Sequence, residues 1–265
     1  MNQLTNVLFT FSSLFTINHA LVGKTTPGWK SRPVVPEIEA QLEGSTKASS
    51  KQPWEFRRFV QQSSQFVTLP FSSTPTKTIL PGDVLWERGQ VKSNDFTFGP
   101  LDDVVMGGVS SSEFDAASGR WVGRVTDANN GGFIGIRSTP SFNYDMSNCQ
   151  GLSFTFQGGQ GKRFKIVTRD STDFNGVCWT TSANVGSTKS FLSQLIGATD
   201  TTTVKVKFQS QIPTIFARTV PNQVFNPSNV VGVQMAYSKF EYDGDLNPNF
   251  ALGDMELQIL EIKAF

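Results

Sequence analysis

Two adjacent carboxylates, Asp102 and Asp103, are the pair of side chains in this sequence best placed to do chemistry. Three roles are open to them: an acid–base pair, ligands for a metal ion, and acceptors for the backbone N–H groups of a turn. Neighbouring residues on a strand point to opposite faces, which disfavours a catalytic pair. We favour the third role, in which one carboxylate orders the turn at residues 106–108, and we expect no catalytic residue.

A metal site at these carboxylates would need further oxygen ligands. The acids that could supply them lie near the C-terminal side and would contribute only if folding brings them close: Asp243, Asp245 and Asp254. Nucleotide-binding motifs are absent, because no Gly-x-Gly-x-x-Gly opens a helix and no Walker A sequence occurs. We therefore expect neither a metal ion nor a cofactor.

The carboxylates begin a glycine-rich segment, residues 101–114, and a second such segment follows at residues 129–138. One glycine is enough to supply the positive φ of a turn, so two Gly-Gly pairs this close suggest loops shaped for contact. Thirteen residues are our candidates for binding a partner or ligand: Asp102, Asp103, Met106, Gly107, Gly108, Ser110, Asn129, Asn130, Gly131, Gly132, Phe133, Arg137 and Arg169. The asparagine side chains would also suit a hydroxyl-rich ligand.

Arg137 and Arg169 each end a predicted strand, and two interpretations of them stay open. Either arginine would lock the first glycine-rich loop by forming a buried ion pair with Asp102 or Asp103. The alternative is that the same guanidinium recognises a ligand or a partner protein.

Several classes of function are excluded by composition. His19 is the single histidine and lies in a segment with targeting character, so a Ser-His-Asp triad, a Cys-His pair and a histidine-ligated zinc site are ruled out. The net charge of +1 provides no general attraction to nucleic acid or to an anionic membrane. Cys149 and Cys178 could pair, but two buried thiols are favoured.

The elements that must position these residues are strands. Alternating apolar residues occur at Trp121–Val125, around Phe133–Arg137, and in the sets Leu152, Phe154, Phe156; Val204, Val206, Phe208; and Met255, Leu257, Ile259. Further strands are predicted at residues 162–169, 177–181 and 230–237, with a hairpin connection at residues 158–161 and one internal helix at residues 190–196. This pattern predicts an all-β sandwich of jelly-roll type.

The N-terminal third differs in composition from the rest. Residues 1–36 combine a signal-like apolar run with a basic, Ser/Thr-rich stretch and are predicted to be a targeting segment. Residues 37–82 are predicted to be a linker that contains a short amphipathic helix at residues 53–67 and a Pro/Ser/Thr-rich stretch at 68–81. We expect this helix to dock on the sandwich, residues 83–265, and a partner-binding helix is the alternative.

The ordered motifs resemble the complex I intermediate-associated protein 30 family. The resemblance rests on residues 102–110, on residues 129–133 with Arg137, and on the stretch from Phe225 to Val233. It covers about residues 83–265, and the glycine-rich segment around residue 106 is most similar to a plastid and algal branch. In that branch the sandwich is often joined to a dinucleotide-binding domain, for which residues 1–265 contain no motif.

The resemblance implies a galactose-binding-like jelly-roll sandwich without catalytic activity. It implies an assembly factor for a membrane electron-transport complex, either NADH:ubiquinone oxidoreductase or, in a plastid, a photosystem. The partners would be subunits or intermediates of that complex and other assembly factors, but not nucleic acid. The protein would act in a mitochondrion or plastid, peripheral to an inner membrane and without a transmembrane segment in the mature chain. A carbohydrate-binding module is the alternative.

Overall fold

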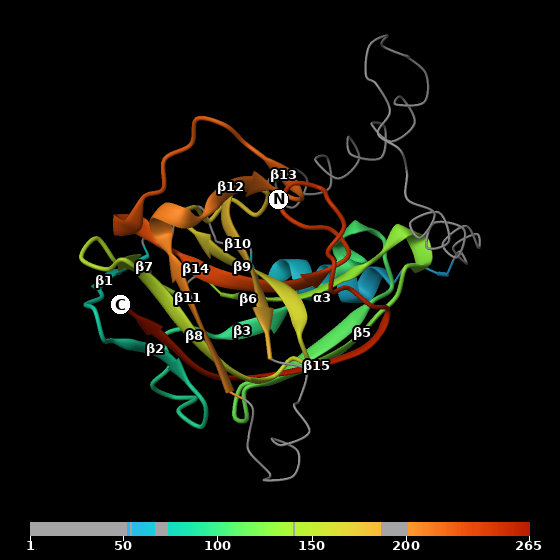
Figure 1. Cartoon of the computed structure of the whole chain (residues 1–265), viewed down its shortest axis with the longest axis horizontal. Helices are drawn as coiled ribbons and strands as arrows, with labels where there is room; N and C mark the ends of the chain where they lie inside the picture. Colours follow the sequence, from blue (N-terminus) through green and yellow to red (C-terminus); the bar gives the residue numbers. More distant parts are fainter. Residues whose placement is uncertain (1–51, 54, 67–73, 140, 187–200) are drawn as a thin grey trace. The chain divides into compact units, whose positions relative to one another are not determined.

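The computed structural model describes residues 52–53, 55–66, 74–139, 141–186 and 201–265. Two antiparallel sheets account for most of them and face each other across a shared apolar core (Figure 1). The predicted fold class, an all-β jelly-roll sandwich with a short N-terminal helical extension, is confirmed. The predicted targeting segment and the predicted helix at residues 190–196 lie outside the described residues.

The first sheet has seven strands and carries both candidate arginines. Its order is β13 (Arg218–Thr219), β12 (Ile212–Ile215), β10 (Cys178–Val185), β9 (Lys162–Arg169), β14 (Gly232–Ser238), β6 (Phe133–Ser138) and β3 (Phe98–Pro100). Strand β9 has the bounds predicted from the sequence. The short strands β12, β13 and β3 were not predicted, because they have too few residues to show alternation.

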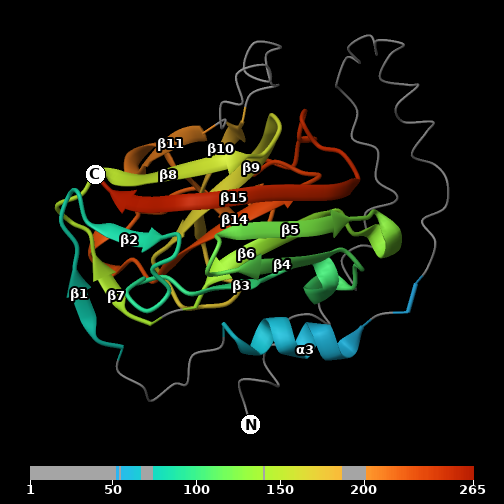
Figure 2. The same cartoon turned by 90° about the horizontal axis from the view of Figure 1, so that it is seen from below.

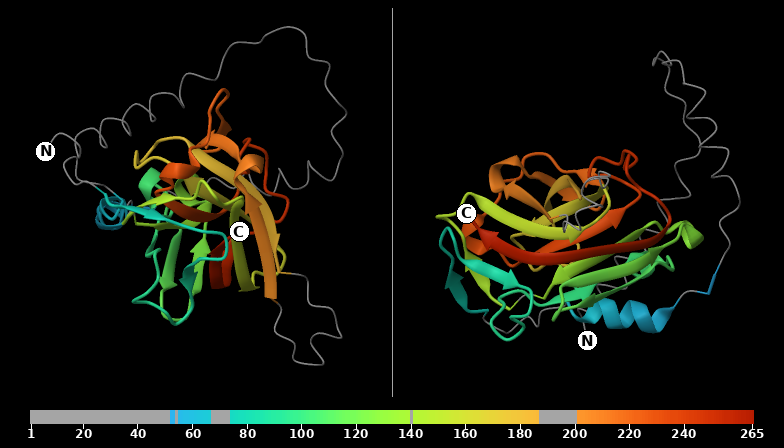
Figure 3. Two further views of the ribbon diagram at one scale, coloured as in Figure 1. Left: turned by 90° about the vertical axis from the view of Figure 1, so that its left-hand side faces the viewer. Right: turned by 60° about the horizontal axis from the view of Figure 1, so that its bottom comes forward.

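The second sheet is built around the long C-terminal strand β15 (Gly253–Ala264), drawn in dark red in Figure 2. Its order is β11 (Thr201–Lys207), β8 (Gly151–Gly158), β15, β5 (Arg120–Val125) and β4 (Ser111–Asp115), and β2 (Val84–Glu87) pairs with the end of β15. Figure 3 shows from two further sides how this sheet lies across from the first.

Inward-facing side chains of the two sheets fill the space between them. The predicted alternation of β8 is confirmed, because Leu152, Phe154 and Phe156 have no exposed surface. Facing them from the first sheet are apolar residues of β9, β14 and β6, among them Phe164, Ile166, Val233, Met235, Ile134 and Ile136. Because Ile134 and Ile136 point inward, the alternate residues of β6, Gly135 and Arg137, point to the outer face of that sheet.

The glycine-rich turn at residues 158–161 is not a hairpin, contrary to the prediction. It leads from β8 in the second sheet to β9 in the first, so the two strands it joins do not pair. Gly158, Gly159, Gln160 and Gly161 all have positive φ. A Cβ at Gly159 would lie 2.8 Å from the carbonyl oxygen of Val185. These residues therefore bend the chain from one sheet into the other, which a two-residue hairpin turn would not do.

Helix α3 (Phe56–Ser64) lies within the predicted amphipathic segment and packs beside the short helix η1 (Asp103–Met106). Figure 2 shows it in blue beside the β3 and β4 end of the sandwich. Its buried residues are Phe59, Gln62 and Ser63. An apolar face at helical spacing would include Phe56 and Val60, but these side chains are 54% and 43% exposed. The docking face is therefore partly polar, which an apolar periodicity does not reveal.

The segment predicted to be a linker contributes to the fold. Residues 76–78 form strand β1 (Thr76–Thr78), which pairs in parallel with β7 (Asn143–Asp145). The Pro/Ser/Thr-rich composition concealed this strand, because its side chains are exposed. No helix in the described part of the chain is long and apolar enough to cross a membrane.

Candidate functional site

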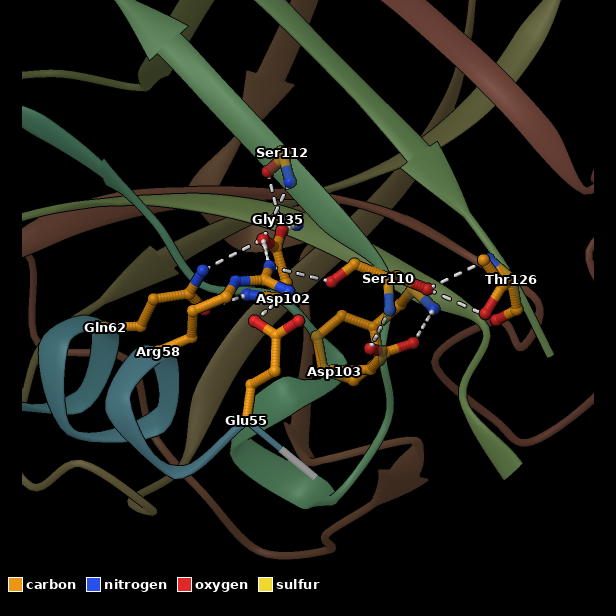
Figure 4. A network of polar contacts seen from close by, with 10 residues as sticks. Glu55, Arg58, Gln62, Asp102, Asp103, Ser110, Ser112, Thr126 and Gly135 are labelled. Carbon is orange, nitrogen blue, oxygen red and sulfur yellow. Dashed lines mark hydrogen bonds and ion pairs between the residues drawn. The ribbon is translucent and has the colours of Figure 1, made fainter. Parts of the chain in front are cut away.

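Asp102 is the buried centre of a polar network between helix α3 and the sandwich (Figure 4). It precedes η1 and has no exposed surface. One carboxylate oxygen accepts the hydroxyl of Ser112 at 2.6 Å and the backbone N–H of Gly135 at 3.3 Å. The other accepts the backbone N–H of Ser112 at 2.9 Å. Burial raises the pKa of Asp102, and these hydrogen bonds partly oppose that shift.

Helix α3 completes the surroundings of this carboxylate. The side-chain amide of Gln62 donates to Asp102 at 3.0 Å and accepts the backbone N–H of Asp102 at 2.8 Å. Arg58 donates to the same carboxylate at 3.4 Å and to the backbone carbonyl of Ser110 at 3.0 Å. Both ends of the Gln62 amide are therefore used, and this reciprocal pair fixes the helix against η1.

The arginine beside Asp102 is thus Arg58, so of the two interpretations left open for Arg137 and Arg169, the ion pair with Asp102 or Asp103 does not form. Strand β6 presents the N–H of Gly135 to Asp102, whereas Arg137 lies two residues further along. The sheet register places Arg137 opposite Gln234, and its Nε donates to the Gln234 side chain at 2.9 Å.

Asp103 joins the two glycine-rich segments. One of its carboxylate oxygens accepts the backbone N–H of Ser110 at 2.8 Å. The other accepts those of Gly132 at 2.8 Å and Phe133 at 3.4 Å. The expectation that a carboxylate orders this turn is confirmed, but the same carboxylate also fixes the second loop. Burial raises its pKa as well, against these hydrogen bonds.

The space that Asp103 occupies explains one glycine of each Gly-Gly pair. A Cβ at Gly108 would lie 2.3 Å from its Cγ, and a Cβ at Gly131 would lie 2.4 Å from one carboxylate oxygen. The other glycine of each pair has a positive φ, +93° at Gly107 and +138° at Gly132. Each pair therefore combines a left-handed backbone with a close approach to one buried carboxylate.

The two loops also meet through Asn129, which has a φ of 56°. Its side chain donates to the carbonyl of Gly107 at 3.2 Å and exchanges two hydrogen bonds with the backbone of Gln52. Asn130 is exposed, and Met106 is 48% exposed. Met106 and Asn130 are therefore the candidates whose side chains are most accessible to a partner.

This arrangement is suited to holding the two loops. Asp102 and Asp103 are buried, and each of their oxygens accepts at least one hydrogen bond from the protein. Among the described residues, no group of three or more His, Cys, Asp or Glu side chains could hold a metal ion. Both cysteines are free, Cys149 buried and Cys178 half-buried.

Arg137 and Arg169 form a second cluster, on the outer face of the seven-stranded sheet. Strand β14 lies between them, with Gln234 opposite Arg137 and Gly232 opposite Arg169. Their exposed fractions are 8% and 4%. They line one small cavity together with Phe66, which follows helix α3.

The thirteen candidate residues therefore lie in two separate places in the structure. Arg58, Gln62 and Phe66 were not among the candidates because they lie in the N-terminal extension, where only apolar periodicity was considered. Gln234 was not among them either. The sequence signal for Gln234 was its position between the core residues Val233 and Met235, which places its side chain on the outer face.

Comparison with solved structures finds similar folds at low sequence identity. The family 11 carbohydrate-binding module of the cellulosomal cellulase Lic26A-Cel5E of Clostridium thermocellum is 13% identical, with a TM-score of 0.46, covering 71% of this chain and 95% of the module. The agarase AgWH50C is 10% identical, with a TM-score of 0.39, covering 71% of this chain and 26% of the enzyme. The glycoside hydrolase domain Endo-D from Streptococcus pneumoniae R6 is 11% identical, with a TM-score of 0.32, covering 64% and 21%.

The chain spans about a quarter of the agarase's length. Comparison with curated proteins found no match. The sequence model described as "Complex I intermediate-associated protein 30" matches residues 89–259, which include both glycine-rich segments, Arg137 and Arg169. Because this match covers well over half of the sequence, the chain belongs to the Complex I intermediate-associated protein 30 family.

Proposed function

We propose that this protein is a non-enzymatic assembly factor that holds subunits or intermediates of a membrane electron-transport complex, NADH:ubiquinone oxidoreductase in the first instance. The observation that carries the proposal is the family match over residues 89–259. The site supports it, because the paired carboxylates are buried and serve as hydrogen-bond acceptors that hold two loops.

Mechanistically, Asp103 fixes the relative position of the two loops, and helix α3 is fixed against the first loop through Asp102. A surface preorganised in this way loses little conformational entropy when it binds a partly built subunit. Met106 is the exposed apolar side chain on this surface and its best candidate anchor. Capture of a client until its permanent partner arrives requires such complementarity and no chemical step.

The protein would act in an organelle, at the surface of an inner membrane, alone or with other assembly factors. Mitochondrion and plastid correspond to different clients, so identification of the client identifies the compartment. The carbohydrate-binding alternative expects exposed aromatic rings near Asn129 and Arg137. Of the two rings beside Arg137, Phe66 is 3% exposed and Phe174 is half-buried, and both face the guanidinium, which does not favour that alternative.

The test is affinity purification of the C-terminally tagged full chain from its own cells, followed by mass spectrometry of the co-purifying proteins. Recovery of NADH:ubiquinone oxidoreductase subunits would support the proposal and a mitochondrial location. Recovery of photosystem components would support an assembly role in the plastid. Recovery of neither, with retention on a sugar resin, would overturn the proposal.

A pair of variants makes this test specific for the loops. Met106→Glu places a charge on the proposed anchor and should reduce client recovery by about tenfold, the usual effect of losing a central contact. The matched control is Val224→Glu, which changes an 89% exposed side chain outside both loops. Equal recovery with both variants would show that the client does not bind at the 101–114 loop.

A further inference from the structure

Arg137 is a buried cation held in place by two aromatic rings. Its Cζ lies 5.4 Å from the centroid of the Phe66 ring and 5.0 Å from that of Phe174. Its Nε donates to Gln234 at 2.9 Å. No described residue accepts a hydrogen bond from either of its two terminal nitrogens. Among the described residues, the guanidinium is therefore held at one edge only, through Nε.

Arg169 adds a second buried positive charge to the same cavity. Its terminal nitrogens donate to the Cys178 sulfur at 2.8 Å and to the backbone carbonyls of Ser171 and Asp173. Within the described part of the chain, neither Arg137 nor Arg169 forms an ion pair with an acid. Burial, and then the charge of Arg169, lower the pKa of Arg137 to about 9. Two buried cations without an anion are unfavourable, and a bound anion would relieve this.

The cavity between the two arginines offers hydrogen-bond donors. The other described residues that line it are Phe66, Ser138, Ser171, Thr172, Val231 and Gly232, and none of these carries a carboxylate. The Ser138 oxygen accepts the N–H of Val233, so its own proton is free to be donated. The two oxygens of a carboxylate match the paired donors at the edge of a guanidinium.

We propose that the cavity lined by Arg137 and Arg169 binds a carboxylate of the client protein, as the charge-specific part of its recognition surface. This inference rests on the proposed function, because it names the chemistry of the client group. A carboxylate can come from an Asp or Glu side chain or from a chain terminus. Both sources present the same two oxygens to the guanidinium.

The probe is sodium acetate, added to the isotope-labelled full chain at constant ionic strength while NMR follows the Nε–H signals of Arg137 and Arg169, the second of which is also present in a variant at position 137. The expected result is a saturable shift of both signals. Arg137→Gln should weaken acetate binding at least about tenfold, because it removes the charge and the two free terminal donors. Arg163→Gln is the matched control on the same sheet face, since Arg163 is already paired with Glu241 at 2.8 Å. This control should leave acetate binding unchanged.

Two further ligands identify the source of the carboxylate. N-acetyl-glutamate methylamide with its α-carboxyl blocked presents only a side-chain carboxylate, and N-acetyl-glycine presents only a terminal one. Tighter binding of either compound than of acetate supports the proposal and names the source. Tighter binding of methyl phosphate than of all three carboxylates would overturn it.

A shift that does not saturate, or a shift of the Arg169 signal that is equal in wild type and Arg137→Gln, would also overturn the proposal. If Arg137→Gln does not fold, the wild-type Nε–H titration decides by itself. Acetate binding and client capture are measured separately. If the protein binds acetate but captures no client, the proposed function is overturned and the carboxylate site is not. If it captures the client but does not bind acetate, only the carboxylate site is overturned.

Discussion

Replacing Gly108 by alanine should destabilise the protein as much as removing the Asp103 carboxylate itself. A Cβ at position 108 would lie 2.3 Å from Cγ of Asp103 and 2.4 Å and 2.8 Å from its two oxygens, so the carboxylate must move. That movement would break its hydrogen bonds with the backbone N–H groups of Ser110 and Gly132. Each buried N–H left without an acceptor costs about 1–3 kcal/mol, which gives about 3 kcal/mol for the pair.

The same reasoning predicts strong coupling between the two positions. Asp103→Ala leaves the same two N–H groups unpaired and should also cost about 3 kcal/mol. In the double variant the alanine at 108 has room, so the total should stay near 3 kcal/mol instead of rising to about 6 kcal/mol. Urea unfolding measures all three free energies, provided that the dependence on urea is unchanged.

Gly176→Ala is the matched control for this cycle. Its Cβ would be 3.0 Å from Cβ of Asp173, a tight contact that touches neither loop, and it should cost less than about 1 kcal/mol. Additive costs in the double variant, or a cost at Gly108 no larger than that at Gly176, would refute the idea that one carboxylate holds both loops.

The network around Asp102 predicts a loss of stability on substitution of Gln62 and a pH dependence of stability. Gln62→Ala removes both hydrogen bonds between the Gln62 side chain and Asp102 and should lower the free energy of unfolding by about 2 kcal/mol, with faster proteolysis of the helix. The control Gln61→Ala, at an exposed neighbouring position, should change little. Burial raises the pKa of Asp102 above its ordinary value of 3.8, so the folded protein binds a proton on this carboxylate more tightly than the unfolded chain does. The contribution of Asp102 to stability therefore falls as the pH rises above 3.8. The stability of wild type relative to Asp102→Asn should therefore increase as pH is lowered from 7 towards 4 in urea unfolding, and no change in this difference would contradict the raised pKa.

Strands that alternate over six or more residues could be predicted from the sequence, and short ones could not. The alternation of Leu152, Phe154 and Phe156 reflects one buried face, which is what periodicity detects. Strand β1 has three exposed residues and so carries no such signal. The turn at residues 158–161 shows a related limit, because glycines indicate a positive φ but not which sheet the next strand joins.

The sequence indicated that the two glycine-rich segments are special, but it did not indicate the contacts that their residues make. Two Gly-Gly pairs suggested two contact loops, yet Gly108 and Gly131 are glycines chiefly because Asp103 occupies the space beside them. The pairing of Asp102 with α3 depends on Gln62, whose amide has no sequence signature in a segment assigned by apolar periodicity. Long-range polar contacts of this kind require coordinates, since many side chains of the right type compete for each acceptor.

The glycine-rich motif contains buried residues that fix the loops and exposed residues that a client can touch. Asp102, Asp103 and Gly108 are buried and fix the loops, so substitutions there change partner capture by changing the fold. A loss of capture at these positions does not identify a contact. Met106 is exposed within the same motif, and Arg137 lines a cavity beside α3. A client that touches the protein directly must be sensitive to substitution at such positions while the free energy of unfolding stays unchanged, and this combination separates recognition from support.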